Sequence, residues 1–394
     1  ITWGPFFESA GFLMLVFSIS THAVSKIGHL IYVGFSYVPP GPNRAARVAG
    51  VLSARRAGTK PPPPYPNGWY AVAESGELGT GGVKAVDALG TCYFNGVSSS
   101  VDAYCPHLGA HLAVGGAVRG DCIECPFHRW RFGADGALVG VPGLETAPKG
   151  VSIKTWRTVE ADGAVWIWYD AEGREPLWQL EDAPELKTWR CRGRNEFIVG
   201  CHIQEIPENG ADVAHLNAVH SSSLLTSLAE KYPILANFIG THHWTANWQK
   251  GEGADSHTAV IQLTHDYKIC KLSLMHLDVV VTQLGPGHVR LRISTPAGPL
   301  LIAQSVTPLR ARRQRVAHRV FSPRRSAPLA AVLNWAEARM IERDIVIWNN
   351  KKYISSPIYV KTDKSIKAFR SWFSQFYSEH SISFKEASER TLEW

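Results

Sequence analysis

The sequence predicts an α+β protein in which a small antiparallel β domain precedes a larger domain with a helix-flanked antiparallel sheet. Short runs of β-branched and aromatic residues, such as 69–72 and 164–169, alternate with Gly-rich turns and indicate the β domain at 68–173. Strand-like and helical stretches then follow at 258–263, 277–283, 289–293, 329–350 and 366–377. They indicate a second domain at 174–394, and with 394 residues and 45% hydrophobic content the chain can bury a large core.

The first 40 residues are apolar enough to suggest a membrane segment. Residues 9–25 contain no Asp, Glu, Lys or Arg, and a second apolar stretch runs from 27 to 38. Together they are long enough to span a bilayer, so we expect a transmembrane helix within 1–40, with a cleaved signal or a buried helix as alternatives. The basic, Pro-rich connector at 41–67 then places the rest in the cytosol by the positive-inside rule. The expectation is a single-pass membrane protein, for example of the endoplasmic reticulum.

Charge and cysteine content narrow the function classes. The net charge is +7, and much of the basic charge falls in one run: Arg310, Arg312, Arg313, Arg315, Arg319, Arg324 and Arg325. No recognised nucleic-acid module accompanies this run, so we expect a solvated face, or one that meets anionic lipid or an acidic electron donor. The seven cysteines show no paired spacing apart from one motif, which favours a reducing compartment.

That motif is C-x-H-x17-C-x2-H. It comprises Cys105, His107, Cys125 and His128. Two thiolates and two neutral imidazoles from two short loops are typical of a Rieske [2Fe-2S] cluster, in which the thiolates bind one iron and the imidazoles the other. A structural zinc site uses the same ligand types and is the alternative. Pro106 and the glycines of the loops favour the cluster, because they stiffen the loops and let backbone N–H groups approach sulfur.

The segment 102–136 resembles the Rieske domain of the non-haem iron oxygenases. The respiratory branch carries one extra cysteine in each loop, and here those positions are Ala110 and Phe127. Arg129 stands where the family usually has Gly, which questions the local packing but not the ligation. Cys122 is expected to be a buried thiol rather than a ligand.

A second redox centre is indicated by the pattern Asp212-x2-His215-x4-His220. The pattern is weak alone, because single histidines on a helix are usually structural. After a Rieske motif, His215 and His220 resemble the two histidine ligands of a mononuclear Fe(II) held by two His and one carboxylate. Residues five apart on an ideal helix lie about 140° apart in angle, so we predict a break or π-bulge between 216 and 220.

The resemblance implies the remaining site residues. The segment 341–348 is similar to the one that carries the metal aspartate, so Asp344 is the expected third ligand and Glu342 the alternative. In the family, the aspartate at the position of Asp212 links the first histidine ligand to a cluster histidine of a neighbouring subunit, here His128. Asp212 would therefore orient His215 and serve catalysis as part of the electron path, and the expected assembly is a homotrimer.

The strings at 66–70, 206–217 and 342–353 resemble the animal cholesterol 7-desaturase (Neverland-type) family. The resemblance implies desaturation of cholesterol at C7–C8 to 7-dehydrocholesterol for steroid hormone synthesis, using O2. Electrons would come from NAD(P)H through a separate reductase, since no G-x-G-x-x-G follows a strand here. A Rieske hydroxylase of a steroid or other hydrophobic ring compound, and a non-enzymatic electron carrier, are the alternatives. No periodic pattern is expected to mark the pocket.

Overall fold

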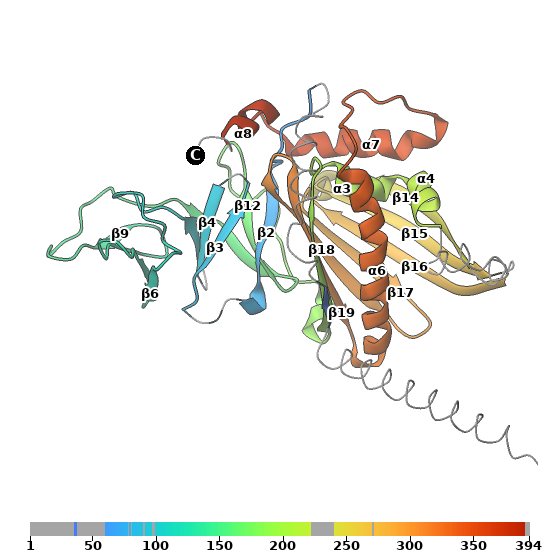
Figure 1. Cartoon of the computed structure of the whole chain (residues 1–394), viewed down its shortest axis with the longest axis horizontal. Helices are drawn as coiled ribbons and strands as arrows, with labels where there is room; N and C mark the ends of the chain where they lie inside the picture. Colours follow the sequence, from blue (N-terminus) through green and yellow to red (C-terminus); the bar gives the residue numbers. More distant parts are fainter. Residues whose placement is uncertain are drawn as a thin grey trace, which may run out of the picture.

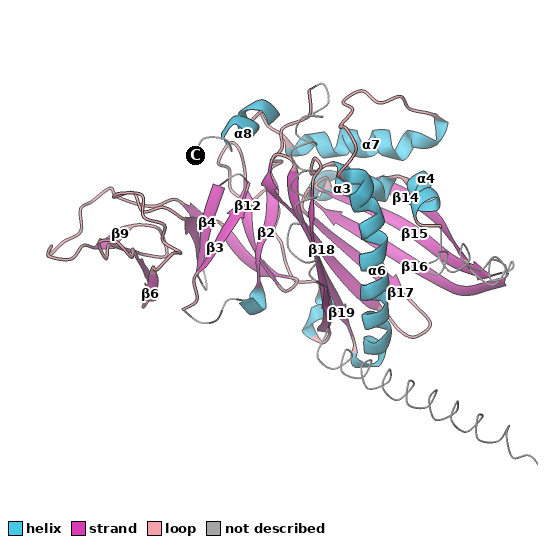
Figure 2. Cartoon of the chain, in the orientation of Figure 1, coloured by secondary structure: helices cyan, strands magenta, loops and turns pink. Residues whose placement is uncertain are grey.

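The chain folds into a β-rich lobe and a larger lobe built on one wide sheet (Figure 1). The computed structural model describes residues 35–37, 60–77, 79, 81–89, 91–96, 99–221, 240–269 and 272–390. Figure 2 shows strands and loops through most of the first lobe, apart from a short 3-10 helix at Ser75–Glu77, and the longer helices on the second lobe and at its junction with the first. The predicted α+β architecture is confirmed for these residues.

The first lobe contains three small sheets. Their strand orders are β10-β5-β4-β3, β11-β12-β2 and β6-β7-β8-β9, all antiparallel. The strands are β2 (Gly68–Glu74), β3 (Lys84–Ala88), β4 (Thr91–Gly96), β5 (Ser99–Asp102), β6 (Ala117–Arg119), β7 (Cys122–Glu124), β8 (Arg131–Phe132), β9 (Leu138–Gly140), β10 (Thr155–Trp156), β11 (Thr158–Ala161) and β12 (Ala164–Tyr169). The sheet β6-β7-β8-β9 forms the tip farthest from the second lobe (Figure 1).

The second lobe is an eight-stranded sheet of order β1-β13-β19-β18-β17-β16-β15-β14. Its strands are β1 (Phe35–Tyr37), β13 (Arg190–Val199), β14 (Thr241–Lys250), β15 (Thr258–Ile269), β16 (Leu272–Leu284), β17 (His288–Ser294), β18 (Leu300–Arg310) and β19 (Arg313–Ser322). The α-helices among the described residues are α3 (Glu205–Glu208), α4 (Val213–Val219), α6 (Ala327–Trp348), α7 (Lys364–Phe373) and α8 (Phe384–Arg390). Helix α6 crosses one face of this sheet (Figure 2).

The two lobes share a hydrophobic core, so the first lobe packs against the second and is not held only by the connecting chain. Trp69 and Trp166 of the first lobe pack in the same buried cluster as Val306 and Val281 of the large sheet. Burying such large aromatic surfaces is the main stabilising term in folding. The shared core fixes the first lobe against β18, an inner strand of the large sheet.

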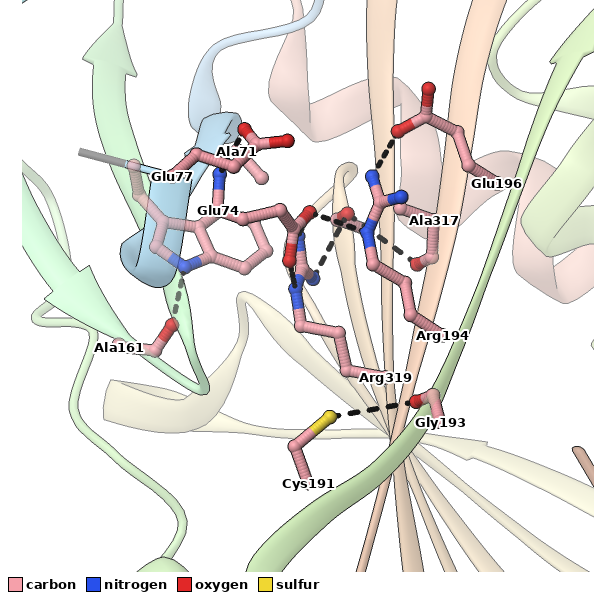
Figure 3. Close-up of polar contacts among 12 residues, drawn as sticks. Ala71, Glu74, Glu77, Ala161, Cys191, Gly193, Arg194, Glu196, Ala317 and Arg319 are labelled. Carbon is pink, nitrogen blue, oxygen red and sulfur yellow. Dashed lines mark hydrogen bonds and ion pairs between the residues drawn. The ribbon is translucent and has the colours of Figure 1, made fainter. Parts of the chain in front are cut away.

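Ion pairs reinforce this junction. Glu74 on β2 lies between Arg319 and Arg194 (Figure 3), with Nε–O distances of 2.5 Å to Arg319 and 3.0 Å to Arg194. Burial raises the pKa of Glu74, but the hydrogen bonds and charge of Arg319 and Arg194 outweigh it and hold the pKa below its ordinary value. Asp162, fully buried, pairs in the same way with Arg290 at 2.6 Å.

The expectation that the basic run forms a solvated face is therefore wrong for much of the run. Arg312 and Arg319 are buried. Arg310 pairs with Asp87 at 2.9 Å, and Arg315 donates to the backbone carbonyl of Ala71 at 2.5 Å. Burying a charge costs free energy unless it is paired, and the first lobe supplies partners for Arg310, Arg315 and Arg319. Arg313, Arg324 and Arg325 do remain exposed.

The expected membrane helix falls mostly outside the described residues. Within the expected segment, Phe35–Tyr37 are described, and they form β1, which pairs in parallel with β13. Of the helices that the structure describes, none is long and apolar enough to cross a bilayer.

Candidate metal centres

The four residues of the first motif meet at the tip of the first lobe. Cys105 follows β5 and Cys125 follows β7, and both thiols are buried and unpaired by disulfide. Burial raises the pKa of the Cys105 thiol, and the neighbouring Cys125 raises it further. The rings of His107 and His128 lie with centroids 4.6 Å apart, and His107 is exposed. We refer to these four residues as the Cys/His site.

The two loops of this site have matching backbone conformations. Cys105 accepts a backbone hydrogen bond from Gly109 at 2.9 Å, and Cys125 accepts one from Arg129 at 3.1 Å. Gly109 and Arg129 both have positive φ, at 72° and 60°. That conformation favours glycine, so the departure at Arg129 places a side chain in a strained backbone position. Its guanidinium pairs with Glu124 at 3.1 Å, which offsets part of the strain.

The loop geometry fits a [2Fe-2S] cluster. Two adjacent thiols lie inside and two imidazoles lie toward the surface, so the thiolate and imidazole ends of a cluster have separate partners. The ring of His107 also stacks on Trp130, with centroids 4.3 Å apart and planes 5° apart. Cys122 is half-buried on β7, where we expected a buried thiol.

The second motif lies at the short helix α4. His215 is within this helix, which ends at Val219, and His220 has left it with φ −109° and ψ 9°. The predicted break is confirmed, as a helix end rather than a π-bulge. Because the chain turns there, the two rings approach to 5.2 Å between centroids.

Asp212 precedes α4 and contacts His215 through both its side-chain carboxylate and its backbone carbonyl. Its carboxylate accepts a hydrogen bond from the backbone N–H of His215 at 3.0 Å and so caps the helix. The ring Nδ1 of His215 bonds the backbone carbonyl of Asp212 at 2.9 Å. Within one chain, the ring is therefore oriented by the carbonyl and not by the carboxylate, which corrects that part of the expectation.

Asp344 completes the group from α6. Its carboxylate lies 3.1 Å from Nε2 of His220 and 3.5 Å from Nε2 of His215, and it is buried. One ligand atom from each of these three residues lies within 4.8 Å of the others. Glu342, the alternative, instead pairs with Arg339 at 2.7 Å. We refer to His215, His220 and Asp344 as the His/Asp site.

The electrostatics of this site favour a bound cation. Burial raises the pKa of Asp344, but hydrogen bonds from His215 and His220 outweigh it and leave the pKa below its ordinary value. Burial lowers the pKa of His215, whereas Asp344 and the Asp212 carbonyl raise it by more. The carboxylate is thus ionised, and binding of a metal would displace the imidazole proton. Two His and one carboxylate are the donor set of non-haem Fe(II) sites.

The His/Asp site opens into an apolar cavity of about 340 Å³ between the large sheet and the helices α3, α4 and α6. Alternate residues of the strands line it, including Leu277, Val279 and Val281 of β16. A volume of this size is in the range of small-molecule sites. The expectation that no periodic pattern marks the pocket is wrong, because the lining follows the period of two of the strands.

Sequence reasoning missed several polar groups at this cavity. Asn209 lies 3.3 Å from Nε2 of His215 through its amide nitrogen. His318 and Glu337, from β19 and α6, lie in the wall. Their positions follow from strand register and helix phase, which no local motif records.

Comparison with known proteins finds a family match for each lobe. A Rieske [2Fe-2S] domain model matches residues 68–157, and a 3-ketosteroid 9alpha-hydroxylase C-terminal domain model matches 167–377. The Cholesterol 7-desaturase nvd of Bombyx mori is 56% identical over 395 residues, covering 97% of this chain and 86% of the relative. That of Drosophila melanogaster is 42% identical, covering 83% and 78%.

A solved structure shows the same fold. NdmA of Pseudomonas putida CBB5 with caffeine aligns with a TM-score of 0.60 at 16% identity, covering 88% of this chain and 97% of the other. This likeness concerns the fold alone. The domain matches and the sequence identities together show that the chain belongs to the cholesterol 7-desaturase family of Rieske-type oxygenases.

Proposed function

We propose that this chain uses O2 and NAD(P)H-derived electrons to desaturate cholesterol at C7–C8, giving 7-dehydrocholesterol for steroid hormone synthesis. The observation that carries the proposal is the convergence of His215, His220 and Asp344 at the edge of an apolar cavity. Family membership supports the sterol substrate, because the relatives named above are cholesterol 7-desaturases.

The His/Asp site and the Cys/His site have different roles in this proposal. His215, His220 and Asp344 would hold Fe(II), and Cys105, His107, Cys125 and His128 would hold the [2Fe-2S] cluster. Bound there, the iron would activate O2 for hydrogen removal and the cluster would supply electrons. The helix cap of Asp212 and its carbonyl fix the ring of His215. The apolar strands exclude water and would hold the sterol rings beside the carboxylate.

A homotrimer is part of the proposal. In one chain the tip with the Cys/His site and the helix α4 lie at opposite ends of the molecule (Figure 1). A partner subunit could place its tip beside Asp212 of this chain, as the family resemblance implies. We also propose a separate reductase as electron donor, and membrane attachment through the apolar amino-terminal segment with the catalytic part in the cytosol.

Hydroxylation is the second candidate, because the second domain matches a 3-ketosteroid 9alpha-hydroxylase model. The test is product mass after incubation of the reduced protein with cholesterol and O2. Desaturation predicts a product that has lost two hydrogens, and hydroxylation predicts one that has gained an oxygen. Absence of any sterol product with both metal sites loaded would contradict both candidates and favour an electron carrier.

A further inference from the structure

A row of polar side chains runs across β13, β19 and β18 at the wall of the cavity. Asn195 on β13 is paired in register with His318 on β19, and His318 is paired with Gln304 on β18. Residues directly opposite in neighbouring strands point to the same face of a sheet. His318 and Gln304 line the cavity, and so does Glu337 of α6. Polar groups inside such a cavity need partners, since burying them unpaired costs free energy.

Some of these partners are present, but Oδ1 of Asn195 and Nε2 of His318 have none among the described residues. The amide of Asn195 donates to Oε2 of Glu337 at 2.7 Å, and Oε1 of Glu337 contacts Nδ1 of His318. His318 is 2% exposed, and its Nε2 has no hydrogen-bond partner among the described residues. A carboxylate can only accept, so Nδ1 carries the ring hydrogen. In the neutral ring, Nε2 is then a hydrogen-bond acceptor.

The distance to the His/Asp site suits a molecule of several fused rings. Glu337 and Asp344 are seven residues apart on α6, which is two turns, so both point from the same face. Their separation along the helix axis is about 10.5 Å. A group held at His318 would therefore lie more than one ring away from the carbon that reacts beside Asp344.

We propose that Nε2 of His318, held by Glu337 and Asn195, accepts a hydrogen bond from the 3-hydroxyl of the sterol. This inference rests on the proposed function and assigns the group that positions the substrate. An acceptor distinguishes a hydroxyl, which donates, from an ether or a missing group, which do not. A site built to bond a hydroxyl rejects analogues that lack it, because its own polar atom stays unpaired.

The other polar pair of the cavity is placed differently. His242 and His265 bond each other, Nδ1 to Nε2, at 2.7 Å, and the backbone N–H of His242 bonds the carbonyl of Ser221, the residue after His220. This pair therefore adjoins the His/Asp site itself. A hydroxyl bound there would put its own ring, and not the C7–C8 bond of the next ring, beside the iron ligands.

The test compares sterols and variants by anaerobic titration of the holoenzyme, so that binding is read without turnover. The sterols are cholesterol and its 3-methyl ether, which cannot donate a hydrogen bond. We expect the wild type to bind cholesterol at least about 5-fold more tightly, since a hydrogen bond left unmade to a buried group costs about 1–3 kcal/mol. His318→Leu should bring this ratio close to one.

Glu337→Gln is the second variant and covers a failure of His318→Leu to fold. A glutamine amide can donate to Nδ1, which would move the ring hydrogen to Nε2 and make it a donor, so the ratio should fall. The control is Asp266→Asn, which removes an exposed His–carboxylate pair with His276, 2.9 Å apart, on the other face of the sheet. It should keep the wild-type ratio.

Three results would overturn the proposal. They are an unchanged ratio in both cavity variants, collapse of the ratio in His265→Leu instead, and no preference in the wild type. Failure of the proposed function would look different. If the wild type shows the expected preference but adds oxygen to cholesterol, the substrate contact stands and the desaturase assignment falls.

Discussion

The Cys/His site and the His/Asp site are assembled over very different stretches of chain. The first takes its four side chains from residues 105–128, on two matching loops at an exposed tip. The second joins His220 to Asp344 across 124 residues, through a helix end and a long helix over a sheet. A loop site can form wherever its small domain folds, whereas the His/Asp site requires the whole second lobe. Substitutions should therefore separate the two sites cleanly.

The largest effect is expected for Asp344→Asn. The amide removes the one carboxylate of the His/Asp site, and we expect turnover to fall about 100-fold or more and the mononuclear iron to be lost. The Cys/His site should keep its cluster signal, because it lies in the other lobe. Turnover, iron per chain and the electron paramagnetic resonance of the cluster would be measured together.

Glu342→Gln is the matched control on the same helix. Its carboxylate pairs with Arg339, so turnover should remain near wild type. Loss of iron in this variant with retention in Asp344→Asn would reverse the ligand assignment.

A smaller effect is expected at Asp212, where two substitutions distinguish two roles. Asp212→Ala removes the cap of α4 and should cost about 1 kcal/mol of stability. Asp212→Asn keeps a capping oxygen but removes the charge. We expect the Asp212→Asn variant to unfold like the wild type in urea yet lose about 10-fold or more in turnover, because it changes the proposed contact to a partner's tip. Full turnover by the Asp212→Asn variant would mean that Asp212 serves only as a helix cap.

The junction between the lobes should depend on pH through Glu74. Its pKa is lowered in the fold, so its stabilisation is complete above the ordinary value of about 4.3 and is lost as pH falls toward the folded value. Glu74→Gln leaves Arg319 buried and unpaired and should cost about 3 kcal/mol at pH 7. The difference from wild type should shrink in acid. Urea unfolding at pH 7 and near pH 3 would measure it.

Glu175→Gln serves as the control for that experiment. Its pair with Arg157 is exposed on both sides, so unfolding should change little at either pH. An equal loss in both variants would mean that Glu74 does not link the lobes.

The smallest effect concerns the strained loop position. Arg129→Gly relieves a left-handed backbone but loses the pair with Glu124, so the free energy of unfolding should change by less than about 1 kcal/mol. Gly109→Ala, at the equivalent position of the other loop, gains no partner and should destabilise by about 1 kcal/mol. Thermal unfolding of the two variants compares them directly, and the opposite order would argue against strain at Arg129.

The same contrast explains what the sequence could predict. The Cys/His site is local, so its spacing was enough to find it. His215 and His220 needed the family pattern, and the choice of Asp344 over Glu342 depended on the phase of one helix. The cavity was missed because apolar residues also face outward: Val280, 44% exposed, lies between Val279 and Val281 and hides their alternation. The role of Arg319 was missed because its partner Glu74 belongs to another lobe.

The most direct test asks whether the two sites work across subunits. Cys125→Ser and Asp344→Asn each disable one site, and each variant alone should be inactive. Co-expressed as mixed oligomers, verified by light scattering, they should regain part of the wild-type turnover of cholesterol, because an intact tip of one subunit can serve an intact His/Asp site of its partner. Mixed oligomers that stay inactive would contradict electron transfer between subunits.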